Sequence, residues 1–194
     1  NGLQFNTTFK NKDVLTTGTE FNFNTTEDRI LGYNRLIDQN VQSLGGYAQY
    51  EWKPLDSFTA MLGTRLDHVR VDGDYTVGGI ARNVDLSQTA LSPRLTLSYQ
   101  LSEVLRLRGG YARGFRAPQA FNEDLHISSV GGEPQFVILS EGLDTEYSNA
   151  FTASFNYAKT VDLLQLDVLL EGFFTTLENP FTLISTGAVL ENGS

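Results

Sequence analysis

The sequence predicts an all-β protein, specifically an antiparallel up-and-down transmembrane β-barrel segment with about eight long strands, short periplasmic turns and long extracellular loops. Three observations predict it. Apolar and polar residues alternate with a period of two over eight segments, the links between those segments alternate between two lengths, and nine charged strand residues share one parity.

The alternation is clearest in residues 91–101, where one face is apolar and the other polar. The apolar positions are Leu91, Pro93, Leu95, Leu97, Tyr99 and Leu101, and Ser92, Arg94, Thr96, Ser98 and Gln100 lie between them. Residues 15–25, 58–67, 147–157 and 164–174 show the same division, with Phe173 as an exception, and residues 3–9, 41–52 and 105–115 show it less cleanly. Each of these eight segments is expected to form a half-buried strand.

The links alternate between short and long. Short links fall at 10–13, 53–57, 102–103 and 159–162, whereas long links fall at 26–40, 72–88 and 117–143, with another loop after Asn179. In an up-and-down sheet, alternate links lie at opposite ends, so the short turns are expected at one rim and the long loops at the other.

Strand length and aromatic placement favour a membrane-spanning sheet. Most segments run about 10 to 13 residues, enough to cross a bilayer at the usual tilt. Aromatic residues of the apolar face gather near the short turns, as in an interfacial girdle. These residues are Phe9, Tyr50, Trp52, Phe58, Tyr99 and Tyr157.

The polar face carries nine charges, which would be costly against lipid and are therefore expected to line a lumen. They are Glu20, Glu51, Arg65, Asp67, Arg94, Arg106, Arg108, Asp167 and Glu171. Arg94, Arg106 and Arg108 are candidate ligand contacts in that lumen. The alternative is a structural salt-bridge lattice along the inner wall.

Composition excludes several classes of function. The net charge of −9 argues against a nucleic-acid partner, because phosphate binding needs a basic surface. Cysteine is absent, which removes disulfides, thiolate nucleophiles and cysteine-based zinc sites. No apolar run approaches the roughly 18 residues of a membrane-spanning helix.

No catalytic arrangement is evident, so we do not expect an enzyme or a cofactor. Phosphate-cradling loops, nucleophile elbows and paired metal-binding histidines are all missing from the sequence. His68 and His126 are expected at an interface and in a loop. Asp72 and Asp74 could offer oxygens to calcium, but two carboxylates are too few, and a solvated turn is favoured.

The stretch from Gly110 to His126 resembles a hallmark of TonB-dependent receptor barrels, in which a strand ends in Gly-Phe-Arg-Ala-Pro and an extracellular loop opens with a short helical turn. The matching residues are Gly114, Phe115, Arg116, Ala117, Pro118, Glu123 and Leu125. A second family pattern begins the next strand, where Leu143, Glu146, Ser148 and Asn149 match and Thr145, Thr152 and Ser154 depart. Over residues 90–158 the resemblance is specific, and elsewhere it is limited to the general alternation of strands and links.

The resemblance implies a parent receptor in the bacterial outer membrane, with about 22 strands and a plugged lumen. Its partners would be outer-membrane lipid, a small-molecule or glycan cargo such as an iron chelate or cobalamin, and TonB and a plug domain through the parent receptor. Because no plug, signal peptide or terminal aromatic residue is recognised, residues 1–194 are expected to be a partial barrel domain. Such a fragment could associate edge to edge with itself.

Two other interpretations remain open at this point: a complete eight-stranded outer-membrane barrel with a structural or adhesive role, and a soluble ligand-binding β-protein. Within the receptor interpretation, the 117–143 loop is expected to touch cargo, because long loops on a rigid barrel vary freely. Its candidate contacts are Phe121, Glu123, Glu133 and Phe136.

Overall fold

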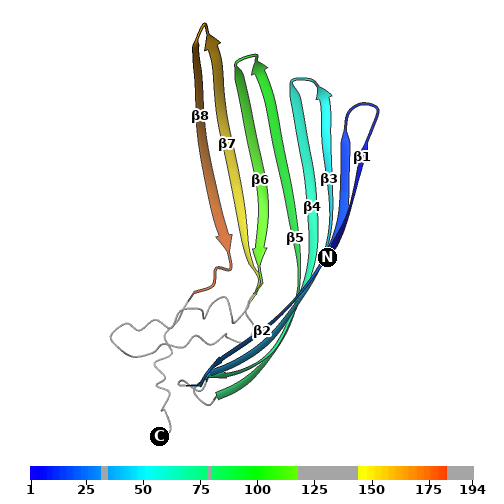
Figure 1. Ribbon diagram of the computed structural model, residues 1–194, viewed down its shortest axis with the longest axis vertical. Coiled ribbons are helices and arrows are strands. Elements are labelled where there is room, and N and C mark those ends of the chain that lie inside the picture. Colours follow the sequence, from blue (N-terminus) through cyan, green and yellow to red (C-terminus); the bar gives the residue numbers. More distant parts are fainter. Residues whose placement is uncertain (32–34, 78–79, 118–143, 183–194) are drawn as a thin grey trace, which may run out of the picture.

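The computed structural model describes residues 1–31, 35–77, 80–117 and 144–182, which form one eight-stranded antiparallel sheet with the strands in sequence order (Figure 1). Its strands are β1 (Gly2–Thr8), β2 (Val14–Ile30), β3 (Arg35–Leu55), β4 (Phe58–Val77), β5 (Ile80–Ser102), β6 (Leu105–Arg116), β7 (Glu146–Val161) and β8 (Leu164–Glu178). Among these residues, no helix is long and apolar enough to cross a membrane. The all-β, up-and-down prediction is confirmed.

The strand register divides the sheet into two chemically different faces. Leu62 lies opposite Leu95, and this side is called the outer face; Arg65 lies opposite Ser92, and this side is called the inner face. Between the short-turn rim and the level of Leu66, the outer face carries leucine and aromatic residues that are largely exposed in this sheet. The faces therefore follow the parity that the sequence predicts.

β2 to β5 extend into the predicted long links, and two of these expected loops are mostly strand. β2 reaches Ile30 and β3 starts at Arg35, and β4 and β5 reach Val77 and Ile80. The predictions of loops at 26–40 and 72–88 were therefore wrong. In β3 to β5, alternation continues through these residues with inverted polarity, which the sequence interpretation treated as the end of each strand.

The inversion is visible in β4, where His68 and Arg70 lie on the outer face and Val69 and Val71 on the inner face. We call the ends of β2 to β5 that lie past the level of Asp67, away from the short-turn rim, the extension. These ends continue beyond the ends of β6 to β8 and bend to one side (Figure 1). This change of the polar residues from the inner to the outer face indicates that the extension and the rest of the sheet lie in different surroundings.

The core of the described residues lies on the inner face of the extension. Val69, Val71 and Ala117 form a buried cluster against which Val41, Leu86 and Phe115 pack. Ile37 and Tyr75 are buried beside it, and the Tyr75 hydroxyl donates a hydrogen bond to Gln39 Oε1 at 2.8 Å. Burial, with a smaller contribution from Asp72, raises the pKa of Tyr75 to about 12.

β6 leaves β5 early. Pairing between β5 and β6 ends at Arg94 and Ala112, whereas β6 continues to pair with β7 as far as Arg116 and Glu146. The end of β6 farthest from the short-turn rim is therefore hydrogen-bonded to β7 alone. Phe115 near this end, and Ala117 just after it, pack onto the extension.

The predicted aromatic row at the short-turn rim is present. Phe58 contacts Trp52 and Tyr99 edge-on, each with ring centroids 6.3 Å apart, and Phe9 contacts Tyr50 at the same distance. Edge-to-face geometry places the positive ring edge against the negative face of its neighbour, which stabilises the pair beyond its buried area.

β1 and β8 form the two edges of the sheet. A complete eight-stranded barrel would require these two strands to pair with each other, and no such pairing occurs in the part of the chain that the structure describes. Unpaired edges expose a row of backbone donors and acceptors that can bind a further strand. The geometry is that of a barrel segment.

The short turn between β1 and β2 is organised by Asp13, which is 1% exposed. One carboxylate oxygen accepts from the Tyr50 hydroxyl at 2.5 Å and from Asn11 Nδ2 at 2.6 Å, and the other accepts from the Lys53 N–H at 2.8 Å. The hydrogen bond from Tyr50, followed by that from Lys53, holds the pKa of Asp13 below its usual value. Asp13 thus joins two turns at the same rim.

We predict that Asp13→Asn destabilises the folded barrel at pH 7, because an amide NH₂ cannot accept the hydrogen bonds from Tyr50 and Asn11. Because the folded-state pKa of Asp13 is lowered, its carboxylate stabilises the fold fully at pH values above its ordinary pKa of 3.8. This stabilisation is lost as the pH falls through the folded-state pKa. Urea unfolding at pH 7 and at about pH 3 should therefore show the gap to wild type shrinking in acid.

Asp56→Asn is the matched control, since Asp56 lies at the same rim and pairs with Lys12 while its side chain is 97% exposed. It should leave the unfolding midpoint unchanged. A wild-type-like Asp13→Asn variant at pH 7, or a gap of the same size at both pH values, would contradict this role.

Candidate functional site on the inner face

The register places all nine predicted charged residues on the inner face. On β2 to β4, Glu20 lies opposite Gly45, which lies opposite Asp67, and Tyr47 lies opposite Arg65. On β5 to β8, Arg108 lies between Ser98 and Ser154, and Ser154 lies opposite Glu171. Between the short-turn rim and the level of Asp67, the inner face is therefore polar across all eight strands, with two distinct charge clusters.

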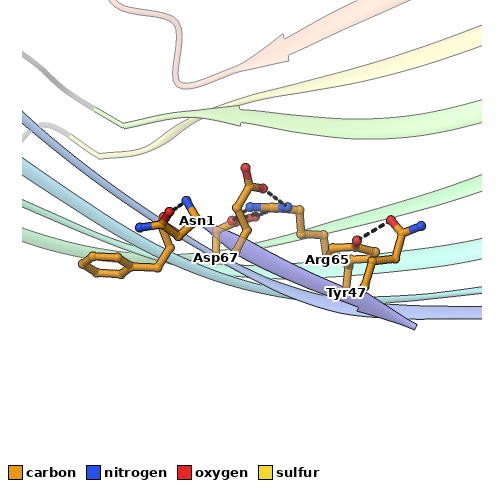
Figure 2. Close-up of polar contacts among 7 residues, drawn as sticks. Asn1, Tyr47, Arg65 and Asp67 are labelled. Atoms are coloured by element: carbon orange, nitrogen blue, oxygen red, sulfur yellow. Dashed lines mark hydrogen bonds and ion pairs between the residues drawn. The ribbon is translucent and has the colours of Figure 1, made fainter. Parts of the chain in front are cut away.

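The first cluster centres on Arg65 and is a closed ion-pair network (Figure 2). Arg65 donates from Nη1 to Glu20 Oε2 at 2.9 Å and from Nε to both carboxylate oxygens of Asp67 at 2.8 Å. Asp67 is only 4% exposed. Here the salt-bridge lattice that the sequence analysis left as an alternative is present.

Tyr47 supports this network from β3. Its ring centroid lies 5.9 Å from Arg65 Cζ, and its hydroxyl donates to Gln4 Oε1 on β1 at 2.8 Å (Figure 2). The amino group of Asn1 donates to the Phe21 carbonyl at 2.9 Å nearby. Side chains from β1 to β4 are thus linked across the inner face.

Two glycines make room for these side chains. A Cβ at Gly18 would overlap the Tyr47 ring, and a Cβ at Gly45 would overlap Arg65 and Asp67. Gly46, the next residue, faces the outer side and has no atom within 4 Å of its would-be Cβ. Glycine at 45 is therefore required by close approach of the ion pair, which sequence alone could not reveal.

The second cluster holds the predicted lumen candidates Arg94, Arg106 and Arg108, and it is open. Arg106 Nε donates to Gln100 Oε1 at 2.6 Å, beside a polar hollow that Thr59, Ser98 and Glu103 help to line. Arg94 and Arg108 form no ion pair with any described residue. Their exposed guanidinium groups can bind an anionic group that comes from outside this chain segment.

The loop candidates Phe121, Glu123, Glu133 and Phe136, together with Pro118, Leu125 and His126, lie outside the described residues. His68 is on the outer face, where its ring contacts Thr89 Oγ1 at 3.0 Å and Ser87 Oγ at 3.2 Å. The described residues contain no group of three or more metal-binding side chains.

The turn predicted around Asp72 and Asp74 is wrong, because both residues lie within β4 on its outer face. Asp74 accepts a hydrogen bond from Asn83 Nδ2 at 2.9 Å on the neighbouring strand. Asp72 lies directly opposite Asp85. These carboxylates belong to the polar outer side of the extension, where alternation had been read as a turn.

The two sequence motifs that resemble receptor barrels form one structural unit. Gly114, Phe115 and Arg116 lie opposite Ser148, Tyr147 and Glu146, respectively. A Cβ at Gly114 would lie 2.9 Å from Ser148 Oγ, so glycine allows the serine to sit against it. The motifs are separated in sequence because they flank the 117–143 segment, but they are cross-strand partners.

Sequence reasoning missed Arg113, which lies on the outer parity of β6 and pairs with Glu178 on β8 at 2.9 Å. A signal was available, because an arginine at an apolar-face position needs a carboxylate partner or a nearby aqueous layer. Its partner could not be found from sequence, since 65 residues separate the two.

We predict that Gly45→Ala destabilises the barrel by about 1 to 3 kcal/mol, because the new methyl group displaces the Arg65–Asp67 ion pair in a packed region. Gly46→Ala is the matched control and should be neutral or slightly stabilising. Urea unfolding of both variants provides the comparison. Equal effects at the two positions would show that the ion pair is loosely packed.

Comparison with known proteins gives a family match across almost the whole chain. Residues 1–193 match the family described as TonB dependent receptor-like, beta-barrel. No curated protein matches the sequence.

Three solved structures share the fold. A double mutant of the Serratia marcescens hemophore receptor HasR, in complex with its hemophore HasA and heme, has 20% identity and a TM-score of 0.66 over 92% of this chain and 32% of its own. The ferric yersiniabactin uptake receptor FyuA from Yersinia pestis has 15% identity and a TM-score of 0.60, covering 92% and 29%.

The alcaligin outer membrane receptor FauA from Bordetella pertussis has 13% identity and a TM-score of 0.54, covering 97% of this chain and 38% of its own. The chain thus spans about a third of the length of these receptors. Since the family match covers the full sheet, a soluble ligand-binding β-protein is no longer a viable interpretation. The chain belongs to the TonB-dependent receptor β-barrel family.

Proposed function

We propose that residues 1–194 are a partial barrel domain of a bacterial outer-membrane receptor that takes up a nutrient ligand with energy supplied through TonB. The observation that carries this proposal is the two-faced sheet, with an apolar outer face and nine charged residues on the inner face. In a barrel, such a sheet faces lipid on one side and a water-filled or plugged lumen on the other.

The polarity switch supports a membrane position. From Phe58 to Leu66, the outer-face residues of β4 are uncharged and largely apolar, and His68 and Arg70 follow. A charged residue on the lipid face costs about 2 to 4 kcal/mol at the bilayer midplane and little near the interface. The bilayer would therefore end near Leu66 and Leu91, with the short turns periplasmic and the extension extracellular.

Strand length is consistent with this placement. β3, β4 and β5 contain 21, 20 and 23 residues, whereas about 9 to 11 residues suffice to cross the hydrocarbon core. The excess forms the extension, whose polar outer face suits water or lipid headgroups. Such a scaffold would hold extracellular segments above the membrane, where cargo arrives.

The ligand we propose is an anionic iron chelate. Arg94, Arg106 and Arg108 offer cationic, hydrogen-bonding groups on the inner face, and carboxylates are the groups that arginine binds best. Similar solved receptors are described with heme or as an uptake receptor for a ferric ligand. TonB and a plug domain would act through the parent receptor, and transport rather than catalysis would be its activity.

We predict that Arg94→Ala or Arg108→Ala in the parent receptor weakens binding of hemin, an iron chelate with two carboxylates, by about tenfold, because a charge-assisted hydrogen bond contributes 1.5 to 3 kcal/mol. Arg70→Ala, which removes an arginine from the outer face, is the control and should bind as wild type does. Absorbance titration with hemin measures all three. Unchanged affinity in both inner-face variants, or no binding by wild type, would contradict the proposed ligand.

A further inference from the structure

We infer that Arg113 and Arg116 link the ends of β6, β7 and β8 that lie away from the short-turn rim into one unit at the extracellular rim. We call these two sets of contacts the tie, and the two arginines act in it as positioning residues and not as cargo contacts. The inference rests on the proposed function only in its claim that this rim affects cargo binding. The two arginines are three positions apart on β6, so they lie on opposite faces of the sheet.

Each arginine is held between an aromatic ring and a carboxylate. Arg113 Nη2 lies 2.9 Å from Glu178 Oε2, and its Cζ lies 4.1 Å from the Tyr147 ring centroid. Arg116 Nε lies 3.4 Å from Glu146 Oε1, and its Cζ lies 4.6 Å from the ring centroid of Phe181. The planar guanidinium can stack on a ring and pair with a carboxylate at once.

The contacts join three strands. Arg113 bridges β6 to Tyr147 on β7 and to Glu178 on β8, and Asn149 Nδ2 donates to the same carboxylate at 2.8 Å. Glu146 on β7 receives Arg116 and also accepts from the Phe181 N–H at 3.0 Å, just past β8. These contacts connect the end of β6, the start of β7 and the end of β8.

This arrangement occurs where the β5–β6 ladder has already ended. Beyond Arg94 and Ala112, β6 has no ladder to β5, and the β7–β8 ladder begins at Tyr147 and Glu178. The end of this unit therefore has no backbone hydrogen bonds on the β5 side, where only the packing of Phe115 and Ala117 joins it to the extension. Without the two arginine contacts, the last pairs of β6–β8 could fray, because terminal hydrogen bonds open at low free-energy cost.

An ordinary surface ion pair contributes little to stability. Whether the pairs of Arg113 and Arg116 contribute more therefore depends on how well they are shielded from water. The side chains of Arg113 and Glu178 are 32% and 53% exposed, and those of Arg116 and Glu146 are 46% and 14% exposed, so each pair has one member that is largely shielded from water. Arg113 Nε itself is buried. By contrast, the outer-face pair of Arg70 and Asp85 is 53% and 56% exposed. Arg70 therefore provides a matched control.

Hydrogen exchange of the parent receptor in detergent micelles tests the tie. Lysine keeps the charge but loses the planar fork and the stacking surface. We expect Arg113→Lys and Arg116→Lys each to speed exchange of the amides at 146–149 and 176–178 by about tenfold. Exchange at 150–157, and heat-modifiable gel mobility as a measure of assembly, should not change.

Arg70→Lys should leave exchange across β4 and β5 unchanged. If exchange at 146–149 and 176–178 stays at the wild-type rate in both lysine variants and in Arg113→Ala and Arg116→Ala, the tie is overturned. If exchange accelerates as expected, the tie stands.

A hemin titration of the same variants tests the positioning role separately. We expect an affinity loss of about fivefold in Arg116→Lys. Accelerated exchange with unchanged hemin affinity would overturn the positioning role while leaving the tie intact. Failure of the wild-type receptor to bind hemin would refute the proposed ligand, and the exchange rates would still decide the inference.

Discussion

The structure depends on the hydrogen-bonded ladder of an antiparallel sheet, which assigns alternate side chains to opposite faces. In lipid, each backbone donor and acceptor must be paired within the protein, so a spanning sheet has to be continuous and, in the intact barrel, closed. Once the ladder fixes the register, a one-residue slip would bring Arg65, Arg94 and Arg108 to the lipid face. The charges that would line the lumen therefore also specify the register, and the apolar outer face follows from the same constraint.

The inner face uses its charges in two ways. Around Arg65 they are satisfied within the sheet, and Gly18 and Gly45 permit the side chains to approach closely. Around Arg94 and Arg108 they are exposed and have no ion-pair partner among the described residues. A closed network adds to structure, whereas open arginines are available for a ligand or for another segment of the parent receptor. The extension adds a third environment, in which the inner face becomes apolar and packs against Phe115 and Ala117.

Sequence alone predicted the fold class, the four short turns and the parity of all nine inner-face charges, because a period of two is local information. The prediction was wrong at the extension, where the polar His68 lies on the outer face and the apolar Val69 on the inner face. Because this polarity is the reverse of that in the rest of the strand, the continuing strand was interpreted as a loop. It also missed Asp13 and the arginine contacts at Glu178 and Phe181, since their partners are distant in sequence and only the folded register brings them together. The loop candidates Phe121, Glu123, Glu133 and Phe136 remain predictions.

The central claim is that β4 passes from a lipid-facing to a water-facing environment near His68 without leaving the sheet. A nitroxide scan of single-cysteine variants of the parent receptor in lipid bilayers, from Phe58 to Thr76, tests it most directly, because collision with oxygen reports lipid and collision with a water-soluble nickel chelate reports water. The account predicts that even-numbered positions up to Leu66 collide mainly with oxygen, and that even-numbered positions from His68 onward collide mainly with the nickel chelate, with alternation preserved throughout. Oxygen-dominated even positions as far as Thr76, or loss of alternation beyond Asp67, would contradict it.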